Sequence, residues 1–319
     1  MKITGSTFPE RVDVYEVGPR DGLQNELRTL HTKDKAALID ALVASGLKRI
    51  EVTSFVSPRW IPQLADAEKL LGLLRRPQGV TFTALVPNLK GLKRAKAVHL
   101  SEAAVFLSVT ESHSKKNINK SVAEAIATAR EVSAAAREAG MRVRCYLSTV
   151  WGCPYEGKVS TLQVVEVVKQ LAELGFYQLS LGDTIGVGTP SQTEEIVAEV
   201  SKILPIEHIA LHLHDTRGTA LANALVGLSL GVTTFDSSIG GLGGCPYAPG
   251  AAGNLATEDL VFMLDGMGIK TGIDLNRLVE AGALAQELIG RKLSGKYLQA
   301  ALGEREKKQR RASTAPSAT

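Results

Sequence analysis

The chain has 319 residues and is 44% hydrophobic, 5% aromatic and 22% charged, which is typical of a globular protein with a large core and excludes disorder over most of its length. The formal charge of +4 is mild and concentrated near the end of the chain, where Glu304–Arg311 holds five basic and two acidic residues. No aromatic residues are interleaved with these charges, so we expect no nucleic-acid partner.

Eight short β-rich runs alternate with amphipathic helical segments along the chain. Strand–helix units in series form parallel sheets, which either close into a (β/α)₈ TIM barrel or open into a doubly wound sheet. The open fold carries a G-x-G-x-x-G motif after its first strand, but this chain has VGPRDGLQNE there, so we predict the barrel. The predicted strands span residues 12–17, 49–55, 81–86, 103–109, 142–148, 177–183, 209–215 and 233–239.

This pattern predicts a single barrel domain over residues 1–303, followed by a basic polar tail over 304–319 that we expect to be disordered. The N-terminal region has no apolar core of signal-peptide length, and no stretch approaches the ~20 apolar residues of a membrane span. The cysteines are odd in number and show no disulfide-scaffold spacing, which favours a reducing compartment. We therefore expect a cytoplasmic protein with no membrane partner.

Polar side chains are predicted to gather inside the barrel, near the C-terminal ends of the strands. Strand residues alternate between the two faces of a sheet, so the outward leucines of IALHLHD leave His212 and His214 pointing inward. The same alternation turns Glu51 inward, and Asp183 ends its strand. The C-terminal rim is where barrel enzymes carry their active sites, so these residues are candidates for function.

The two histidines are spaced, at i and i+2, to share one divalent cation. Asp21, at the end of the first strand, is the nearest carboxylate that could complete the set. Nitrogen and oxygen donors without a thiolate cluster favour Mg²⁺ or Mn²⁺ over structural zinc. The alternative is that both histidines are hydrogen-bonded core residues.

Two loops at the same rim carry further candidates. Arg20 stands beside Asp21 in GPRDGLQNE, where a guanidinium suits a developing oxyanion and a carboxylate suits a metal; the alternative is a turn that contains an ion pair. Residues 240–254, GGLGGCPYAPGAAGN, follow the last strand and are rich in Gly. This segment is a candidate lid with Cys245 near its tip and Asn254 at its far end.

Five segments resemble the 3-hydroxy-3-methylglutaryl-CoA lyase family, which belongs to a superfamily of metal-dependent lyases and synthases on TIM barrels. The R-D-G-x-Q and H-x-H motifs are common to the superfamily and imply carbon–carbon chemistry through an enolate, whereas the Cys245 loop and SFVSPRW are specific to the lyase. The resemblance covers residues 10–295. Its segments are VGPRDGLQNE, SFVSPRWIPQLAD, LGDTIGVGTP, LHLHDT and GLGGCPYAPGAAGNLATEDLVFML.

The resemblance implies cleavage of 3-hydroxy-3-methylglutaryl-CoA to acetyl-CoA and acetoacetate, a step of leucine degradation and ketone-body formation. It implies that Arg20 stabilises the enolate oxygen, that Cys245 donates or relays a proton, and that Glu51 and Asp183 orient the metal-binding side chains by hydrogen bonds. The implied ligands of Mg²⁺ or Mn²⁺ are Asp21, His212, His214 and Asn254.

The implied substrate is an acyl-CoA, which Lys116 and Asn117 in KKNINKS would help to hold; the alternative for this segment is a solvated loop. The nearest rival function is a sister lyase for a longer branched 3-hydroxyglutaryl-CoA. A synthase or aldolase is disfavoured by the Cys245 loop, and a catalytically inactive metal-binding barrel by the presence of all the candidate groups. Because two-fold dimers are the commonest oligomers of soluble proteins, we expect a homodimer.

Overall fold

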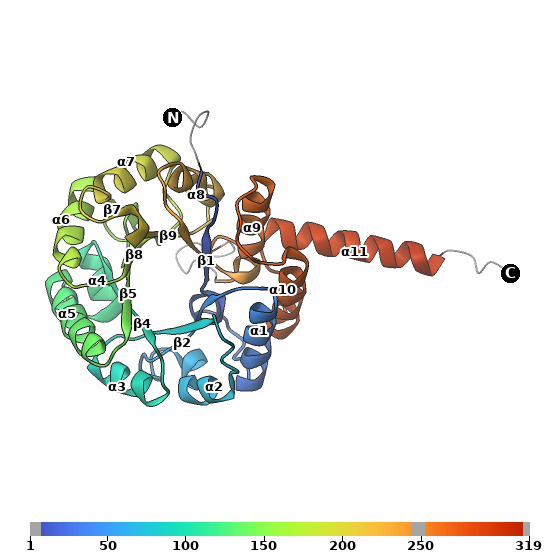
Figure 1. The fold of residues 1–319 in the computed structure, drawn as a ribbon, viewed down its shortest axis with the longest axis horizontal. Helices are drawn as coiled ribbons and strands as arrows, with labels where there is room; N and C mark the ends of the chain where they lie inside the picture. The colour runs from blue at the N-terminus through green and yellow to red at the C-terminus, as the bar shows by residue number, and fades with distance from the viewer. Residues whose placement is uncertain (1–7, 244–252, 315–319) are drawn as a thin grey trace.

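The computed structural model describes residues 8–243 and 253–314, and the eight predicted strands form a closed parallel barrel within them (Figure 1). The strand order is β1-β10-β9-β8-β5-β4-β3-β2, so the first strand pairs with both the second and the last. The predicted TIM barrel is confirmed. Its strands are β1 (Asp13–Glu16), β2 (Arg49–Ser54), β3 (Thr81–Leu85), β4 (Glu102–Ser108), β5 (Arg142–Ser148), β8 (Gln178–Asp183), β9 (Ile209–Leu213) and β10 (Thr234–Ser237).

A ring of helices covers the outside of the barrel (Figure 1). Several begin at residues that cap their free N–H groups: Ser121 forms a capping box with Glu124, and Ser160 forms one with Gln163. The ring consists of α1 (Thr32–Ala44), α2 (Ala67–Leu73), α3 (Leu89–Ala97), α5 (Val122–Glu138), α6 (Thr161–Ala172), α7 (Pro190–Val200), α8 (Ala220–Ser229) and α10 (Leu275–Ile289).

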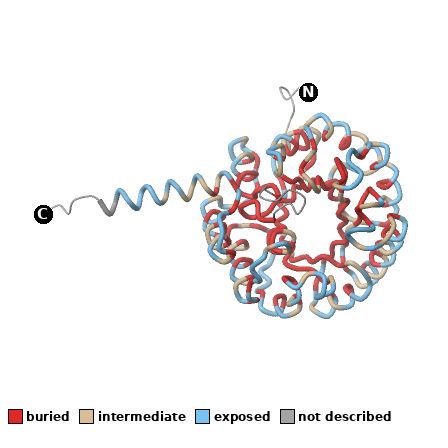
Figure 2. The backbone as a smooth tube through the Cα atoms, turned by 180° about the vertical axis from the view of Figure 1, so that it is seen from behind, coloured by how far each residue is buried: buried red, intermediate tan, exposed pale blue. Residues whose placement is uncertain are grey.

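The hydrophobic core lies between the strands and this ring. Outward residues of the strands, such as Leu211 and Leu213, belong to one large buried apolar cluster with the inner faces of the helices. Figure 2 shows the buried part of the chain around the barrel and the exposed part on the outer side of the helices. This layer is the reason why the strands can carry polar residues on their other face.

The interior of the barrel is strongly polar, although TIM barrels are more often filled by branched apolar side chains. The Arg144 side chain is fully buried and donates two hydrogen bonds to the Asp236 carboxylate, with its Nη1 at 3.1 Å and its Nη2 at 2.5 Å. Ser180 Oγ donates to the same carboxylate at 2.7 Å. These buried groups satisfy one another below the rim and support the residues above them.

Additional elements follow the C-terminal ends of the strands and build up that rim. The chain leaves β1 through a short π-helical turn, and it leaves β5 through a small antiparallel hairpin. These elements are η1 (Gly18–Gly22), η2 (Pro62–Leu64), α4 (Glu111–Ile118), β6 (Gly152–Cys153), β7 (Gly157–Lys158), η4 (Ile239–Gly241) and α9 (Thr257–Gly266), whereas η3 (Ile206–His208) precedes β9 at the opposite end.

The C-terminal segment differs from the expectation of disorder from residue 304. Helix α11 (Lys296–Thr314) continues through the basic stretch and projects away from the barrel (Figure 1). The stretch is rich in Glu, Lys, Arg, Gln and Ala, which are strong helix formers, so charge alone does not prevent the helix. Residues 315–319 lie outside the described part. None of the described helices combines the length and apolar character needed to cross a membrane.

Candidate active site

The turn η1 places Arg20 and Asp21 at the mouth of the barrel. The carbonyl oxygen of Val17 accepts the backbone N–H groups of Arg20, Asp21 and Gly22, at 3.1, 2.7 and 3.2 Å. A Cβ atom at Gly22 would lie 2.9 Å from Ser238 Oγ, so the turn can pack this closely against η4 only with glycine there. The turn therefore holds Arg20 and Asp21 at the rim, whether or not their ion pair also stabilises the turn.

Arg20 lies between two carboxylates. Its Nε donates to Glu51 Oε2 and its Nη1 to Asp21 Oδ1, each at 2.5 Å, and its side chain is only 6% exposed. Tyr146 Oη donates to the same oxygen of Glu51 at 3.1 Å, and the guanidinium carbon lies 5.3 Å from the centre of the Tyr146 ring. Among the described residues, Nη2 of Arg20 has no hydrogen-bond partner, so it is available to a ligand.

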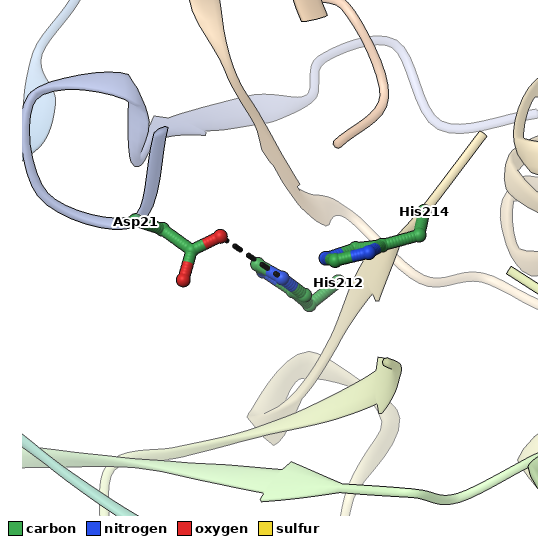
Figure 3. Close-up of side chains that lie close together, drawn as sticks. All are labelled: Asp21, His212 and His214. Atoms are coloured by element: carbon green, nitrogen blue, oxygen red, sulfur yellow. Dashed lines mark ion pairs between the residues drawn. The ribbon is translucent and has the colours of Figure 1, made fainter. Parts of the chain in front are cut away.

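Asp21, His212 and His214 come together across the mouth of the barrel (Figure 3). One ligand atom from each lies within 4.8 Å of the other two, and Asp21 Oδ2 is 4.0 Å from His212 Nε2. The carboxylate comes from η1 and both imidazoles from the end of β9. Two imidazoles and a carboxylate at this separation form a site for a divalent cation.

The protonation of these side chains suits metal binding. Burial would raise the pKa of Asp21, but the charge of Arg20 and the two histidines hold that pKa below its usual value. Burial, and next the neighbouring His212, lower the pKa of His214 to about 4. At neutral pH Asp21 is therefore ionised and His214 neutral, which are the forms that bind a metal.

The second nitrogen of His212 faces Asp236. His212 Nδ1 lies 3.3 Å from Asp236 Oδ2, the carboxylate that also holds Arg144 and Ser180. Since an ionised carboxylate only accepts hydrogen bonds, we assign the proton to Nδ1, which leaves Nε2 free as a ligand. A carboxylate behind a metal-binding histidine is a common way of fixing its tautomer and ring orientation.

Asn254 joins the site from the far end of the Gly-rich segment. Its backbone forms an antiparallel bridge with His214, and its Nδ2 donates to Asp21 Oδ2 at 2.8 Å and to the Leu242 carbonyl at 3.1 Å. Its side chain is buried, and a Cβ atom at Gly243 would lie 2.8 Å from Nδ2. Both described ends of the segment thus reach the predicted metal site, whereas Cys245 lies outside the described residues.

The two remaining polar candidates occupy different positions. Glu51 contacts Arg20 directly, and burial raises its pKa against the lowering effect of that guanidinium. Asp183 instead accepts hydrogen bonds from the backbone N–H groups of Val187 and Gly188, at 3.0 and 2.8 Å. The hydrogen bonds of Asp183 therefore order the loop after β8. Within the described residues, none of them reaches the metal-binding side chains that Asp183 was expected to orient.

A cavity of about 590 Å³ opens above these residues. Arg20, Asp21, His212 and His214 all line it. Of the two residues predicted to hold CoA, Asn117 lines the cavity and Lys116 does not; among the lysines, it is the half-buried Lys120 that lines it. The exposed or partly exposed lining of the cavity, which we call the outer part, also includes Trp60, Pro87, Asn88, Ile118 and Thr128.

Sequence reasoning missed Tyr146 and Asp236, which contact Glu51 and His212. The signal for Tyr146 was present, because RVRCYLS alternates Arg144, Tyr146 and Ser148 on one face just as IALHLHD alternates its histidines. Asp236 stands in the last strand at an inward position of the same kind. Reading every strand for inward polar residues would have found both.

Comparison with known proteins shows what the whole chain is similar to. A family model described as HMGL-like matches residues 11–285. The mitochondrial hydroxymethylglutaryl-CoA lyase of Bos taurus is 52% identical over 92% of this chain and 90% of its own. The crystal structure of hydroxymethylglutaryl-CoA lyase from Pseudomonas aeruginosa superposes with a TM-score of 0.91 at 45% identity, covering 93% of this chain and 99% of that one. A third relative is an HMG-CoA lyase from Acinetobacter baumannii, solved in complex with coenzyme A and 3-methylmalate. It superposes with a TM-score of 0.87 at 37% identity, covering 92% of this chain and 96% of that one.

Proposed function

Since this chain belongs to the HMGL-like family, we propose that it is a carbon–carbon lyase that cleaves 3-hydroxy-3-methylglutaryl-CoA to acetyl-CoA and acetoacetate. The observation that carries the proposal is the placement of Arg20 directly beside the cluster of Asp21, His212 and His214, inside one cavity. The cluster suits the hydroxyl and carboxylate end of such a substrate. The guanidinium suits its thioester end.

The reaction needs one proton removed and one delivered. The 3-hydroxyl loses its proton, the bond between C2 and C3 breaks, and C3 becomes the ketone carbon of acetoacetate. The electron pair of that bond passes to the thioester half as an enolate, which takes a proton at C2 and becomes acetyl-CoA. No water and no redox partner are consumed.

Arg20 is the group that stabilises the negative charge on the enolate oxygen. Glu51 and Asp21 hold its guanidinium by Nε and Nη1, so it is fixed before the charge develops and Nη2 remains for the substrate. Donors that are already oriented toward a developing oxyanion contribute to catalysis more than mobile ones. Glu51 and Tyr146 act as positioning residues for this guanidinium.

Asp21, His212, His214 and Asn254 would hold the cation, with the side-chain oxygen of Asn254 as the fourth donor. Mg²⁺ or Mn²⁺ bound there supplies a Lewis acid that polarises the substrate's 3-hydroxyl and a carboxylate oxygen. Asp236 fixes His212 in the orientation that binding requires. Cys245, on the segment that connects to Asn254, is the proposed donor of the proton to C2.

The outer cavity accommodates the coenzyme. Asn117 and Lys120 line it on one side, and the thioester would enter past them toward Arg20. The structure of the relative from Acinetobacter baumannii is described as a complex with coenzyme A, which supports coenzyme A as part of the ligand. Lys120 therefore replaces Lys116 in our proposal for the CoA-binding residues.

The test is an assay of acetoacetate release from 3-hydroxy-3-methylglutaryl-CoA. Protein treated with a chelator should be inactive, and added Mg²⁺ or Mn²⁺ should restore turnover. His212→Ala should lose affinity for Mn²⁺, measured by calorimetry, together with its activity. His208→Ala is the matched control, because His208 lies before β9 at the opposite end of the barrel and should keep both. Absence of acetoacetate with every metal would overturn the proposed reaction, and full turnover of the metal-free protein would overturn the role of the cation.

A further inference from the structure

One wall of the cavity is largely apolar, and of its members only Tyr146, through its contact with Glu51, has a part in the chemistry described above. Leu85, Ala104 and Tyr146 form a small buried cluster, separate from the main core, with Val56 and Phe106 packed against it and partly exposed. Cross-strand pairs hold this wall together: Leu85 is paired with Ala104, and Phe106 with Tyr146. All of its members except Ala104 line the cavity.

The wall faces the polar side of the site across the barrel. In the closed strand order β3 stands opposite β9, and β4 stands opposite β10. Leu85 ends β3 and Phe106 lies near the end of β4, whereas His212 is on β9. Tyr146 connects the two sides, since its ring centre is 5.8 Å from that of His212 and 5.3 Å from the guanidinium carbon of Arg20.

Packing of the fold does not account for this wall. The core that stabilises the barrel lies outside the strands, and the interior below the wall is filled by Arg144, Asp236 and other hydrogen-bonded polar groups. A side chain serving only as core would be covered, but Phe106 and Val56 stay partly exposed toward the cavity. An apolar surface beside such polar groups is suited to an apolar part of a ligand.

We infer that Leu85 and Phe106 form the surface on which the alkyl group at C3 of the substrate packs, and that they set the length of alkyl group the enzyme accepts. This inference rests on the proposed function. C3 is tetrahedral and carries a hydroxyl, two polar arms and one alkyl group. With the hydroxyl and carboxylate held at Asp21, His212 and His214, and the thioester at Arg20, the alkyl group is the substituent left to face the opposite wall.

The wall therefore decides between the methyl substrate and a longer branched one. Phe106 is the larger of the two wall residues that remain partly exposed, so its ring leaves room for a short alkyl group. A hydrophobic pocket discriminates by about 10- to 200-fold for each methylene that is missing or added. Wild type should accordingly prefer methyl over butyl at C3 by at least about tenfold in kcat/KM.

The experiment measures kcat/KM for three substrates: 3-hydroxyglutaryl-CoA, its 3-methyl derivative and its 3-butyl derivative. Phe106→Ala should raise the butyl-to-methyl ratio at least about tenfold, and Phe106→Leu should raise it less. Leu85→Phe should lower the turnover of the two alkylated substrates. Turnover of 3-hydroxyglutaryl-CoA, which has no alkyl group, should be unchanged. Circular dichroism identifies variants that fail to fold, and Phe106→Leu keeps the volume change small.

Trp60→Ala is the matched control, because Trp60 is an aromatic residue that lines the same cavity, does not belong to the wall cluster and is 73% exposed. It should change kcat/KM for all three substrates by the same factor. The inference would be overturned if folded Phe106 variants kept the wild-type butyl-to-methyl ratio of kcat/KM. It would also be overturned if they lost kcat/KM equally for all three substrates, which is the result expected if the pantetheine arm packs on this wall. A wild type that releases no acetoacetate or homologous product would instead overturn the proposed function itself.

Discussion

Replacing Asp236 by Asn should weaken both the fold and the metal site, for two separable reasons. The carboxylate accepts hydrogen bonds from Arg144, Ser180 and His212. The change removes its charge with little change in shape. Arg144 then has no charged partner although it is fully buried, and His212 loses the acceptor that fixes its tautomer.

The two effects can be given magnitudes. Breaking a buried ion pair costs about 3–5 kcal/mol, and the lower end applies because the amide oxygen still accepts one hydrogen bond. A loss of about 3 kcal/mol lowers the Tm of a domain of 319 residues by roughly 4–5 °C, because its unfolding entropy is about 0.7 kcal/mol/K. Loss of the carboxylate behind a metal-binding histidine typically weakens metal affinity by about 10- to 100-fold.

Calorimetric titration of the chelator-treated protein with Mn²⁺ and a thermal melt measure these effects independently. Ser180→Ala is the matched control, since it removes one hydrogen bond from the same carboxylate without touching His212. It should cost about 1 kcal/mol of stability and leave the Kd for Mn²⁺ unchanged. A folded Asp236→Asn protein with wild-type Mn²⁺ affinity would refute the reasoning that Asp236 orients His212.

Two further substitutions test other parts of the site, and a third tests a buried carboxyl group of β1. Arg20→Lys keeps a charge near Glu51 and Asp21 but loses the planar fork, so kcat should fall by about 10²- to 10⁴-fold in the acetoacetate assay; an unchanged kcat would remove Arg20 from the chemistry. Cys245→Ala should keep Mn²⁺ and acyl-CoA binding while kcat falls by about 10²- to 10⁴-fold, and loss of Mn²⁺ binding would contradict its role in proton transfer. Burial raises the pKa of Glu16 from 4.5 to about 7, so the folded protein keeps a proton that the unfolded chain has released, and stability falls as the pH rises through this range. In Glu16→Gln the side-chain oxygen can still accept hydrogen bonds from the Gly18 and Ile239 N–H groups. Its free energy of unfolding, measured with denaturant, should therefore exceed that of wild type by up to about 3 kcal/mol at pH 8 but not at pH 4. An equal difference at both pH values would contradict this reasoning.

The sequence by itself determined the strands, the barrel and the residues that meet at its mouth. Period-two alternation is a local property, so IALHLHD alone showed that both histidines turn away from the apolar layer. The parallel order then placed every C-terminal strand end on one rim, and this brought Asp21 to the histidines. Motif resemblance added Asn254, which the bridge to His214 places beside Asp21.

Only the tertiary structure decided how these groups are supported and which substituents they face. Tyr146 comes to Glu51 from a strand 95 residues away in the sequence. Asp236 comes to His212 across the pair β9 and β10, whose register no local pattern specifies. Asp183 reads like a site residue, yet it bonds to the loop after its own strand because the Val187 and Gly188 amides lie within reach. The apolar wall of Leu85 and Phe106 lies opposite His212 only because the sheet closes into a barrel. Closure places β3 and β4 across one cavity from β9, and the distance between these strands along the chain does not show this.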